Sequence, residues 1–346
     1  MAKRIVAIYD RGIDKNLMQG FDVLEKYGYE LTLVEKTVNE DELAYQNSML
    51  SVEVNGPDGT PINEEVFQYL DDAEIIITHF APVSRRMIEA AKNLKIIATL
   101  RTGMENINME AAKERSIRVI NAPGRAAVAV ADFTVAAMLC EIRNIARTDE
   151  DIKTGGWTKK YPNRTYSDNM CNLKVGLVGF GDIGRKIATR LKGFGTTILA
   201  YDPYCTKESI EAFGCVPVSL DELLEQADFV SLHVRLSPQT QNMFGAAEFA
   251  KMKPTAIFVN AARAGLVDEA AMIDALEQKK IGGAVLDVFR EEPLPVDHPL
   301  RKLKNVTLSA HLAGTDIGTF SGSIKIVADN LEQYFSGGEL KNVVNH

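Results

Sequence analysis

The sequence lacks several features that would place it in other protein classes. Its four cysteines form no CxxC pair, so a disulfide framework is not indicated, and we expect no bound metal. No apolar run approaches the roughly 18 residues of a membrane span, and the run after the basic start is too short for a signal-peptide core. Acidic residues outnumber basic ones by 47 to 39, which leaves no overall positive field for nucleic acid or an anionic membrane. We therefore expect a cytoplasmic protein without nucleic-acid or membrane partners.

What the sequence does contain is a regular alternation of short apolar runs and helical patterns. The runs are rich in Val, Ile and Leu and show no period-two alternation, which is typical of strands buried on both faces of a parallel sheet. The class is therefore α/β, and 346 residues are enough for two domains. A turn-rich stretch over 47–63 is expected to be an exposed loop. The expected strands cover residues 4–10, 30–35, 74–80, 95–101, 118–123, 173–179, 197–202, 228–234, 256–263, 283–289 and 305–311.

A dinucleotide-binding pattern follows the strand at 173–179. Gly179 permits a tight turn, Gly181 lets the backbone approach a pyrophosphate, and Gly184 allows close packing of the next helix on the strand. Eighteen residues after Gly184 the next strand ends at Asp202, whose carboxylate can accept hydrogen bonds from ribose hydroxyls and would repel a 2′-phosphate. A turn without a ligand, and a turn aspartate before Pro203, are the plainer alternatives. Together the features favour NAD over NADP.

This pattern sets the expected domain organisation. We expect a Rossmann dinucleotide-binding domain over 121–312 and a smaller, flavodoxin-like, doubly wound substrate domain over 1–120. Residues 313–346 contain a helical pattern that is expected to return to the first domain. Two chain crossings between domains would create a hinged cleft, which is a common place for a ligand.

Three polar residues stand just beyond successive predicted strands: Arg263, Glu292 and His311. Because the carboxyl ends of parallel strands border one crevice, residues this far apart in sequence can meet around one substrate. Each also has a plain alternative. Arg263 could be a surface ion-pair partner, Glu292 a solvated loop acid, and His311 a hydrogen-bonded cleft histidine without a chemical role.

The segments around these residues resemble the D-isomer-specific 2-hydroxyacid dehydrogenases, especially the phosphoglycerate dehydrogenase branch. The resemblance covers nearly the whole chain and is densest from 95 to 320. It implies an NAD-dependent oxidoreductase that moves a hydride to or from C2 of a small D-2-hydroxy or 2-oxo acid, and it implies a homodimer. The matching segments are LRTGMENINMEAA, VINAPGRAAVAVADFTVAAML, VGLVGFGDIGRKIA, LHVRLSPQT, NAARAGLVDEAAMIDAL, GAVLDVFREEPLP and NVTLSAHLAG.

The resemblance also implies a role for each site residue. His311 would be the acid/base that protonates the carbonyl oxygen, and Glu292 would orient it and favour its charged form. Arg263 would bind the substrate carboxylate with its planar fork. The loop Arg101, Thr102, Gly103 would grip the substrate through backbone N–H groups. Asp287 would face the nicotinamide carboxamide, and the NAD site would also include Thr102, Asp182, Ile183, Val234, Ala261, Ala262, Arg263, His311 and Gly314.

Some positions depart from the family pattern. Arg235 replaces a usual proline, Ala310 replaces a frequent proline, and Arg101 stands where a small residue is common. Arg101 and Arg125 could accommodate a second anionic or polar group on the substrate, or they could simply be solvated.

Two other readings remain open. A formate-type relative would carry glutamine in place of Glu292, whereas a phosphite-type relative is harder to exclude. A non-enzymatic, NAD-sensing corepressor with the same fold would keep all three polar residues. The absence of a basic patch or an interaction tail argues against the corepressor.

Overall fold

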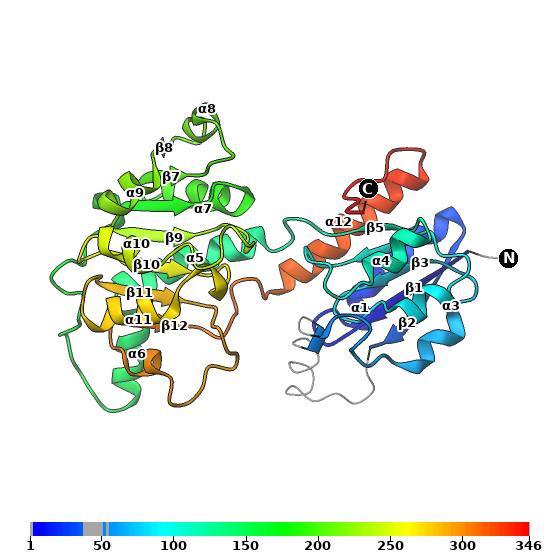
Figure 1. Ribbon diagram of the computed structural model, residues 1–346, viewed down its shortest axis with the longest axis horizontal. Helices are drawn as coiled ribbons and strands as arrows, with labels where there is room; N and C mark the ends of the chain where they lie inside the picture. The colour runs from blue at the N-terminus through cyan, green and yellow to red at the C-terminus, as the bar shows by residue number, and fades with distance from the viewer. Residues whose placement is uncertain (1–2, 37–50, 53–54, 346) are drawn as a thin grey trace. The chain divides into compact units, whose positions relative to one another are not determined.

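A computed structural model describes residues 3–36, 51–52 and 55–345. The chain forms two compact units, the first made of Met1–Arg125 with Asp316–His346 and the second of Ala126–Thr315 (Figure 1). The units divide a few residues beyond the bounds expected from the sequence. The loop expected over 47–63 lies partly outside the described residues.

The first unit is built on a parallel sheet. Its strands run in the order β2-β1-β3-β4-β5, which is the flavodoxin-like arrangement. Each expected strand of this half is present, with ends shifted by a few residues. The elements are β1 (Lys3–Tyr9), α1 (Lys15–Met18), η1 (Gln19–Tyr27), β2 (Tyr29–Glu35), η2 (Glu64–Tyr69), β3 (Ala73–Thr78), α3 (Arg85–Ala90), β4 (Ile96–Thr99), α4 (Met109–Glu114), β5 (Arg118–Ile120) and α12 (Ile317–Phe335).

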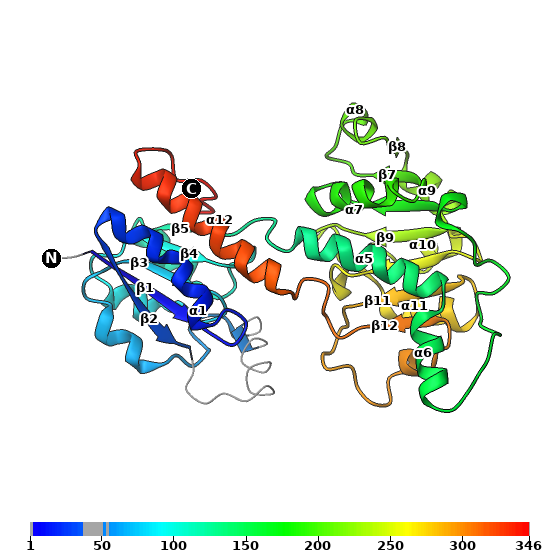
Figure 2. The ribbon, with the colours of Figure 1, turned by 180° about the vertical axis from the view of Figure 1, so that it is seen from behind.

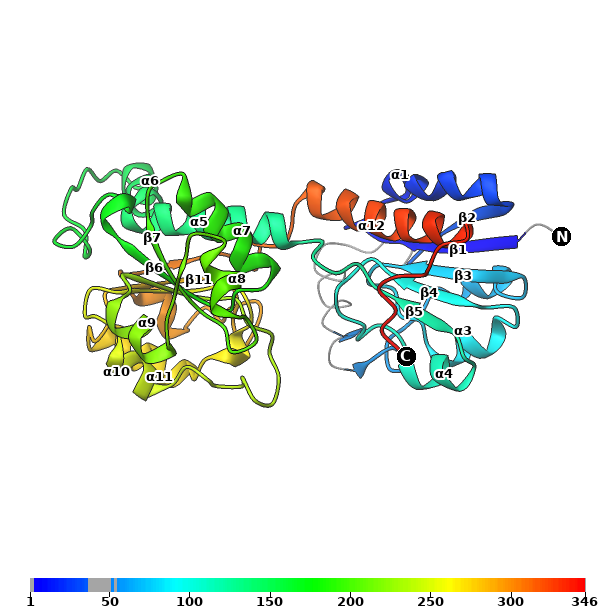
Figure 3. The ribbon, with the colours of Figure 1, turned by 90° about the horizontal axis from the view of Figure 1, so that it is seen from above.

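Helices cover both faces of this sheet. Figure 3 shows α1 and α12 on one face and α3 and α4 on the other. Apolar residues pack between the sheet and each layer, with Phe21 and Leu331 on the α12 side and Met87 and Ile88 on the α3 side. The final helix therefore completes the core of the first unit.

The second unit contains a seven-stranded parallel sheet in the order β12-β11-β10-β9-β6-β7-β8, which is the Rossmann order with one added strand. Each strand expected from the sequence is present. The two-residue strand β8 was not expected. The elements are α5 (Ala127–Ile142), α6 (Ile145–Lys153), η3 (Met170–Asn172), β6 (Lys174–Val178), α7 (Asp182–Lys192), β7 (Thr197–Tyr201), α8 (Lys207–Glu211), β8 (Val216–Pro217), α9 (Leu220–Gln226), β9 (Phe229–Leu232), α10 (Ala246–Lys251), β10 (Ile257–Asn260), η4 (Ala264–Leu266), α11 (Glu269–Glu277), β11 (Gly283–Leu286), η5 (Pro299–Lys302) and β12 (Val306–Leu308).

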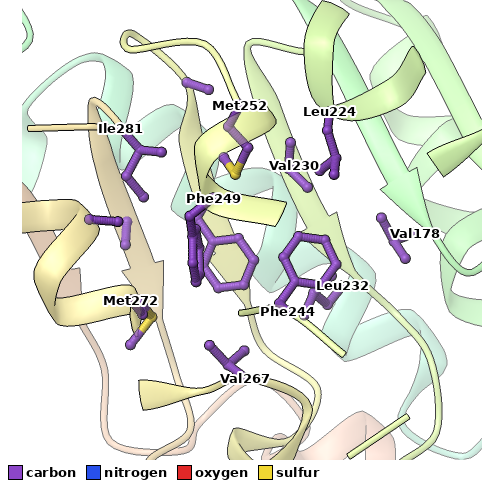
Figure 4. Packing of buried hydrophobic residues seen from close by; sticks show 14 of the residues in the cluster. Val178, Leu224, Val230, Leu232, Phe244, Phe249, Met252, Val267, Met272 and Ile281 are labelled. Carbon is purple, nitrogen blue, oxygen red and sulfur yellow. The ribbon is translucent and has the colours of Figure 1, made fainter. Parts of the chain in front are cut away.

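Two apolar layers hold this sheet between helices. Helices α9, α10 and α11 cover the face seen in Figure 1, and α5 and α7 cover the opposite face in Figure 2. On the first face the rings of Phe244, Phe249 and Phe258 pack against one another. Figure 4 shows Phe244 and Phe249 together with Met252 in this layer. The α/β class and its two doubly wound sheets are confirmed, because continuous apolar runs were buried on both faces as predicted.

Local sequence fixes where the helices begin. Ser219 caps α9 with a full capping box to Glu222, and Asp316 caps α12 by accepting from the Thr319 N–H. Among the described residues, no helix combines the length and the apolarity needed to cross a membrane.

Candidate active site

The glycine turn joins β6 to α7 with the geometry that the pattern predicts. Gly179 has φ +99°, and a Cβ there would lie 2.6 Å from the carbonyl oxygen of His233. A Cβ on Gly184 would lie 2.4 Å from the carbonyl oxygen of Gly179, so only glycine allows this helix to pack so closely. Gly181 differs, because a Cβ there would meet no atom within 4 Å.

The end of α7 at this turn is suited to an anion. Gly181 is the N-cap residue and supplies no side chain to the first N–H groups of the helix. Those donors and the helix dipole therefore face open space of the kind that a pyrophosphate fills. The residues present fit a dinucleotide at this position.

Asp202 lies at the end of β7, beside the glycine turn. Its carboxylate accepts from the Phe180 N–H at 2.8 Å and from the Tyr204 N–H at 2.8 Å, one bond to each oxygen. Each oxygen keeps a second lone pair that can accept a ribose hydroxyl. The bond to Phe180 also ties the acid to the glycine turn, so one arrangement positions both groups.

Arg263, Glu292 and His311 follow β10, β11 and β12, which are adjacent in the sheet. Buried Asn260 fixes the turn before Arg263: its amide donates to the Arg263 carbonyl at 3.0 Å, and its oxygen accepts from the Ala262 N–H at 3.0 Å. Arg263 itself is exposed. Its positive charge acts to lower the pKa of both Glu292 and His311, although stronger effects decide each net shift, so the three groups lie near one another at one edge of the sheet.

Glu292 and His311 form a hydrogen-bonded pair. The Nδ1 atom of His311 lies 2.8 Å from Oε2 of Glu292, and Oε1 of Glu292 accepts from the Phe289 N–H at 2.9 Å. The hydrogen bond to Glu292 raises the pKa of His311 above its usual value, despite partial burial and the charge of Arg263. Burial acts to raise the pKa of Glu292, but the bonds from His311 and Phe289 outweigh it and leave that pKa below its usual value.

The accessibility of the imidazole fits a chemical role. The His311 side chain is 48% exposed, whereas Glu292 is 28% exposed. With Nδ1 committed to the carboxylate, Nε2 is the ring nitrogen available to a substrate. His311 has φ +54°, a left-handed conformation that costs a residue with a Cβ roughly 1–2 kcal/mol, so the loop must be held by other contacts.

Asp287 supplies those contacts. Its carboxylate is 1% exposed and accepts from the Ser309 hydroxyl at 2.6 Å, the Leu312 N–H at 2.8 Å and the Ala313 N–H at 2.8 Å. These donors flank His311 on both sides. In this structure Asp287 therefore fixes the histidine loop, a role that the sequence did not reveal.

The remaining cofactor candidates of the second unit line the same edge. Ile183 packs against a small cluster of Val130, Ala261 and Ala313, and a Cβ on Gly179 would lie 3.0 Å from Val234. Asp182 is exposed in the first turn of α7, Ala262 and Gly314 are half-buried, and Arg235 is exposed.

The expected substrate loop belongs to the first unit. Arg101 is only 8% exposed, and its guanidinium carbon lies 4.2 Å from the centre of the Phe80 ring, so the alternative of a solvated arginine is wrong. Thr102 is exposed, and its carbonyl oxygen accepts from the Asn121 amide at 2.7 Å. Gly103 is half-buried. These residues follow β4, at the carboxyl edge of their own sheet.

A buried acid–histidine pair in the first unit was not identified from the sequence. Asp10 follows β1, His79 follows β3, and both Asp10 oxygens lie 3.1 Å from Nδ1 of His79. Asp10 also accepts from the N–H groups of Gly12, Ile13 and Phe80. The available signal was the one used for Arg263, a polar residue directly after an apolar run. Within the described part of the chain, no cluster of His, Cys, Asp and Glu has the geometry of a metal site.

Comparison with known proteins places this site in a family. Residues 135–313 match the family model described as D-isomer specific 2-hydroxyacid dehydrogenase, NAD binding domain. The chain is 39% identical over 284 residues to D-3-phosphoglycerate dehydrogenase of Methanocaldococcus jannaschii, covering 82% of this chain and 53% of that protein. It is 36% identical over 287 residues to glyoxylate reductase of Korarchaeum cryptofilum, covering 82% of this chain and 86% of that protein. The chain thus spans little more than half the length of the phosphoglycerate dehydrogenase relative.

A solved structure shares the fold over the whole length. The NAD-complexed D-isomer specific 2-hydroxyacid dehydrogenase of Lactobacillus delbrueckii ssp. bulgaricus is 24% identical, covers 99% of this chain and 100% of its own, and superposes with a TM-score of 0.77. The match to the family model and the identities to these relatives confirm the resemblance found in the sequence. The chain belongs to the D-isomer specific 2-hydroxyacid dehydrogenase family, and residues 135–313 form its NAD-binding domain.

Proposed function

We propose that this protein is an NAD-dependent oxidoreductase that transfers a hydride between nicotinamide and C2 of a small D-2-hydroxy acid or its 2-oxo acid. The observation that carries the proposal is the 2.8 Å pair of Glu292 and His311, beside Arg263 at the carboxyl edge of a Rossmann sheet. Bound NAD would supply the hydride acceptor, and NADH the donor.

His311 would handle the proton of the reaction. In reduction its Nε2 would protonate the oxygen on C2, and in oxidation it would take that proton back. Glu292 supports the role, because its hydrogen bond orients the ring and stabilises the imidazolium. A carboxylate that is hydrogen-bonded to a histidine favours the protonated ring, which is the form that can donate a proton to the substrate.

Arg263 would bind the substrate carboxylate and draw charge from the reacting oxygen. A guanidinium offers two parallel N–H donors that match a carboxylate, and it stays charged at all relevant pH values. Within the first unit, we assign binding of the substrate acid to Arg101 and to the backbone N–H groups of Thr102 and Gly103. We accordingly assign substrate binding to 1–120 with 313–346, and cofactor binding to 121–312.

The cofactor site would be formed by the turn and its neighbours. The N–H groups around Gly181 would bind the pyrophosphate and Asp202 the adenosine ribose. A further set of polar and apolar residues would line the rest of the cofactor site, and Asp287 would act mainly through the histidine loop. These lining residues are Thr102, Asp182, Ile183, Val234, Ala261, Ala262 and Gly314.

A homodimer and a cytoplasmic location complete the proposal. Helices α5 and α6 expose Val128 (52%), Ile145 (58%) and Ile152 (48%), and such apolar exposure on neighbouring helices suits a subunit contact. Light scattering of the purified protein would test the dimer, and a monomer at micromolar concentration would refute it.

The substrate test is direct. Purified protein is mixed with NADH and a panel of glyoxylate, pyruvate, hydroxypyruvate and phosphohydroxypyruvate, and loss of NADH absorbance is followed. The last acid is included because one relative is a phosphoglycerate dehydrogenase. Turnover of at least one acid supports the proposal. NADH binding without turnover of any of them would favour an NAD-sensing protein instead.

A further inference from the structure

A cavity opens in the first unit at the edge of the sheet where the strands begin, which we call the amino edge. Because the five strands are parallel, this edge is opposite the carboxyl edge where the substrate loop begins. The cavity has a volume of about 420 Å³, which lies in the usual range of small-molecule sites, about 300–1,000 Å³. Its walls are the first residues of the strands and the end of α12, which runs over the sheet toward the start of β1 (Figure 3). The cavity is therefore large enough for a ligand and lies apart from the substrate loop of the same unit.

Basic side chains predominate in the lining of the cavity. It contains three cations, Lys3, Lys95 and Arg118, and one carboxylate, Glu74. Lys95 pairs with Glu74, with Nζ 2.7 Å from Oε1. Within the part of the chain that the structure describes, no carboxylate forms an ion pair with Lys3 or Arg118. Two positive charges are thus left for an anion to balance.

Tyr334 on α12 holds Arg118 in position. The guanidinium carbon of Arg118 lies 4.5 Å from the centre of the Tyr334 ring, and Nη2 donates to the Tyr334 hydroxyl at 2.6 Å. A guanidinium carries five N–H donors, and among the described residues this is its one hydrogen bond. One edge with two parallel donors therefore remains, and such an edge matches a carboxylate. Because the tyrosine already restrains the side chain, little rotamer freedom is lost on binding.

Tyr29 forms another wall of the cavity. Its ring stacks on Phe335 of α12 with 4.7 Å between centres, and its hydroxyl donates to Oε2 of Glu74 at 3.1 Å. Burial and the charge of Glu74 raise the pKa of Tyr29, so the hydroxyl stays protonated and Glu74 accepts one donor on each oxygen, from Tyr29 and from Lys95. The Lys3 ammonium lies 5.3 Å from the centre of the Tyr29 ring. An anion at this wall would therefore meet a cation over an aromatic ring, and not an uncovered carboxylate.

The two cations without carboxylate partners belong to different strands. Lys3 begins β1 and Arg118 begins β5, and β3 and β4 lie between them. At about 4.8 Å per strand spacing, roughly 14 Å separates their backbones. The floor between them is apolar, because Ile75 and Ile96 are buried there and share a sheet face with Arg118, which pairs with Ile96. Lys3 lies on this face too, since it alternates with Ile5, which pairs with Ile75. A molecule that reaches both cations must be elongated, with an anionic group at each end and an apolar middle.

We propose that this cavity binds an elongated dicarboxylate, with one carboxylate at Lys3, the other at Arg118 and an aliphatic chain over the apolar floor. Carboxylates fit better than phosphates, because each end of the cavity offers one positive charge and a phosphate dianion would bring excess negative charge toward Glu74. The ligand would also hold the end of α12 to the sheet, since Tyr334 bonds Arg118. The site lies within the first unit and does not depend on the proposed function.

The test compares dicarboxylates with monocarboxylates of equal length by calorimetry at low ionic strength. Adipate is compared with hexanoate and suberate with octanoate, and succinate serves as a dicarboxylate too short to reach both cations. We expect the better of adipate and suberate to bind at least about tenfold more tightly than its monocarboxylate, as for one added hydrogen-bonded charge pair, and more tightly than succinate. Equal affinities within each pair, tightest binding of succinate, or no binding of any acid up to about 10 mM would overturn the inference.

Substitutions test where the dicarboxylate binds. Lys3→Gln and Arg118→Gln each remove one end of the proposed site, so the preference for the dicarboxylate over its monocarboxylate should vanish in both variants. Lys113→Gln is the matched control, because it removes the same charge from α4 on the other face of the sheet, and it should keep the preference. Thermal unfolding verifies that each variant is folded, and Lys3 is exposed at the start of its strand, so its replacement leaves the core intact. A preference that survives in folded Lys3→Gln would mean that the acid binds elsewhere and would overturn the inference.

Discussion

Replacing Asp287 with asparagine tests whether this acid works through the histidine loop. The carboxylate accepts three hydrogen bonds from residues on either side of His311, two at Oδ1 and one at Oδ2. Asparagine has nearly the same shape but only one acceptor oxygen. In the side-chain orientation that loses fewer hydrogen bonds, the amide oxygen takes the place of Oδ1 and still accepts from Ser309 and Leu312. The amide NH₂ group then faces the Ala313 N–H, which has lost its acceptor. At least one charge-assisted bond is lost at a site that is 1% exposed.

The magnitude follows from that count. A hydrogen bond to a charged group is worth about 1.5–3 kcal/mol, so Asp287→Asn should lower the free energy of unfolding by that amount. For a unit of this size each kcal/mol lowers Tm by roughly 2–4 °C, which gives a decrease of about 3–12 °C. If the same energy holds the strained His311 in place, kcat falls by up to about 10- to 150-fold at 1.36 kcal/mol per decade.

The assay separates loop positioning from cofactor contact. We expect kcat for reduction of a 2-oxo acid to fall while the KM for NADH stays within about twofold, because loop loss affects proton transfer. Asp228→Asn is the matched control. Asp228 precedes β9, at the amino ends of the strands and so away from the site, where its carboxylate accepts from the Lys174 N–H and from the Lys253 ammonium group. This control variant should be less stable than the wild type but should keep its kcat. A raised KM for NADH with unchanged kcat in Asp287→Asn would refute the positioning role.

Four further substitutions follow from the site. Glu292→Gln removes the group that most raises the pKa of His311, so kcat/KM for reduction should decline at lower pH than in the wild type, and an unshifted profile would contradict the pairing. Gly181→Ala should raise the KM for NADH at least about tenfold, because its Cβ would project into the space proposed for the pyrophosphate, and it should change Tm little because that Cβ meets no protein atom within 4 Å. Gly184→Ala should instead lower Tm, because its Cβ would lie 2.4 Å from the carbonyl oxygen of Gly179. Asp202→Ala should increase the kcat/KM for NADPH relative to NADH, and an unchanged ratio would argue against the ribose role.

Much of the fold could be predicted because burial leaves a strong signal. Strands such as Ile257–Asn260 and Phe229–Leu232 are buried throughout, so their apolar runs are continuous. The glycine turn set the start of the second sheet, and its strand order followed from the known dinucleotide-binding arrangement. Strand β8 escaped notice because two residues, Val216 and Pro217, are too few to form a pattern.

The site was predictable where chemistry follows strand order and less so where it depends on packing. Glu292 and His311 were found because each follows a strong apolar run. The Asp10–His79 pair required knowing that β1 and β3 are neighbours, although 69 residues separate the two side chains. The burial of Arg101 and the bonds of Asp287 depend on loop conformations that no local sequence pattern encodes.

The most direct measurement is turnover and NADH affinity in His311→Ala, compared with the wild type on the best acid of the panel. Loss of a positioned acid/base should lower kcat by about 10²- to 10⁴-fold. The dissociation constant for NADH should stay within about twofold, since we propose that Gly181 and Asp202 hold the cofactor. Turnover close to wild type in that variant would show that the proton does not pass through this histidine.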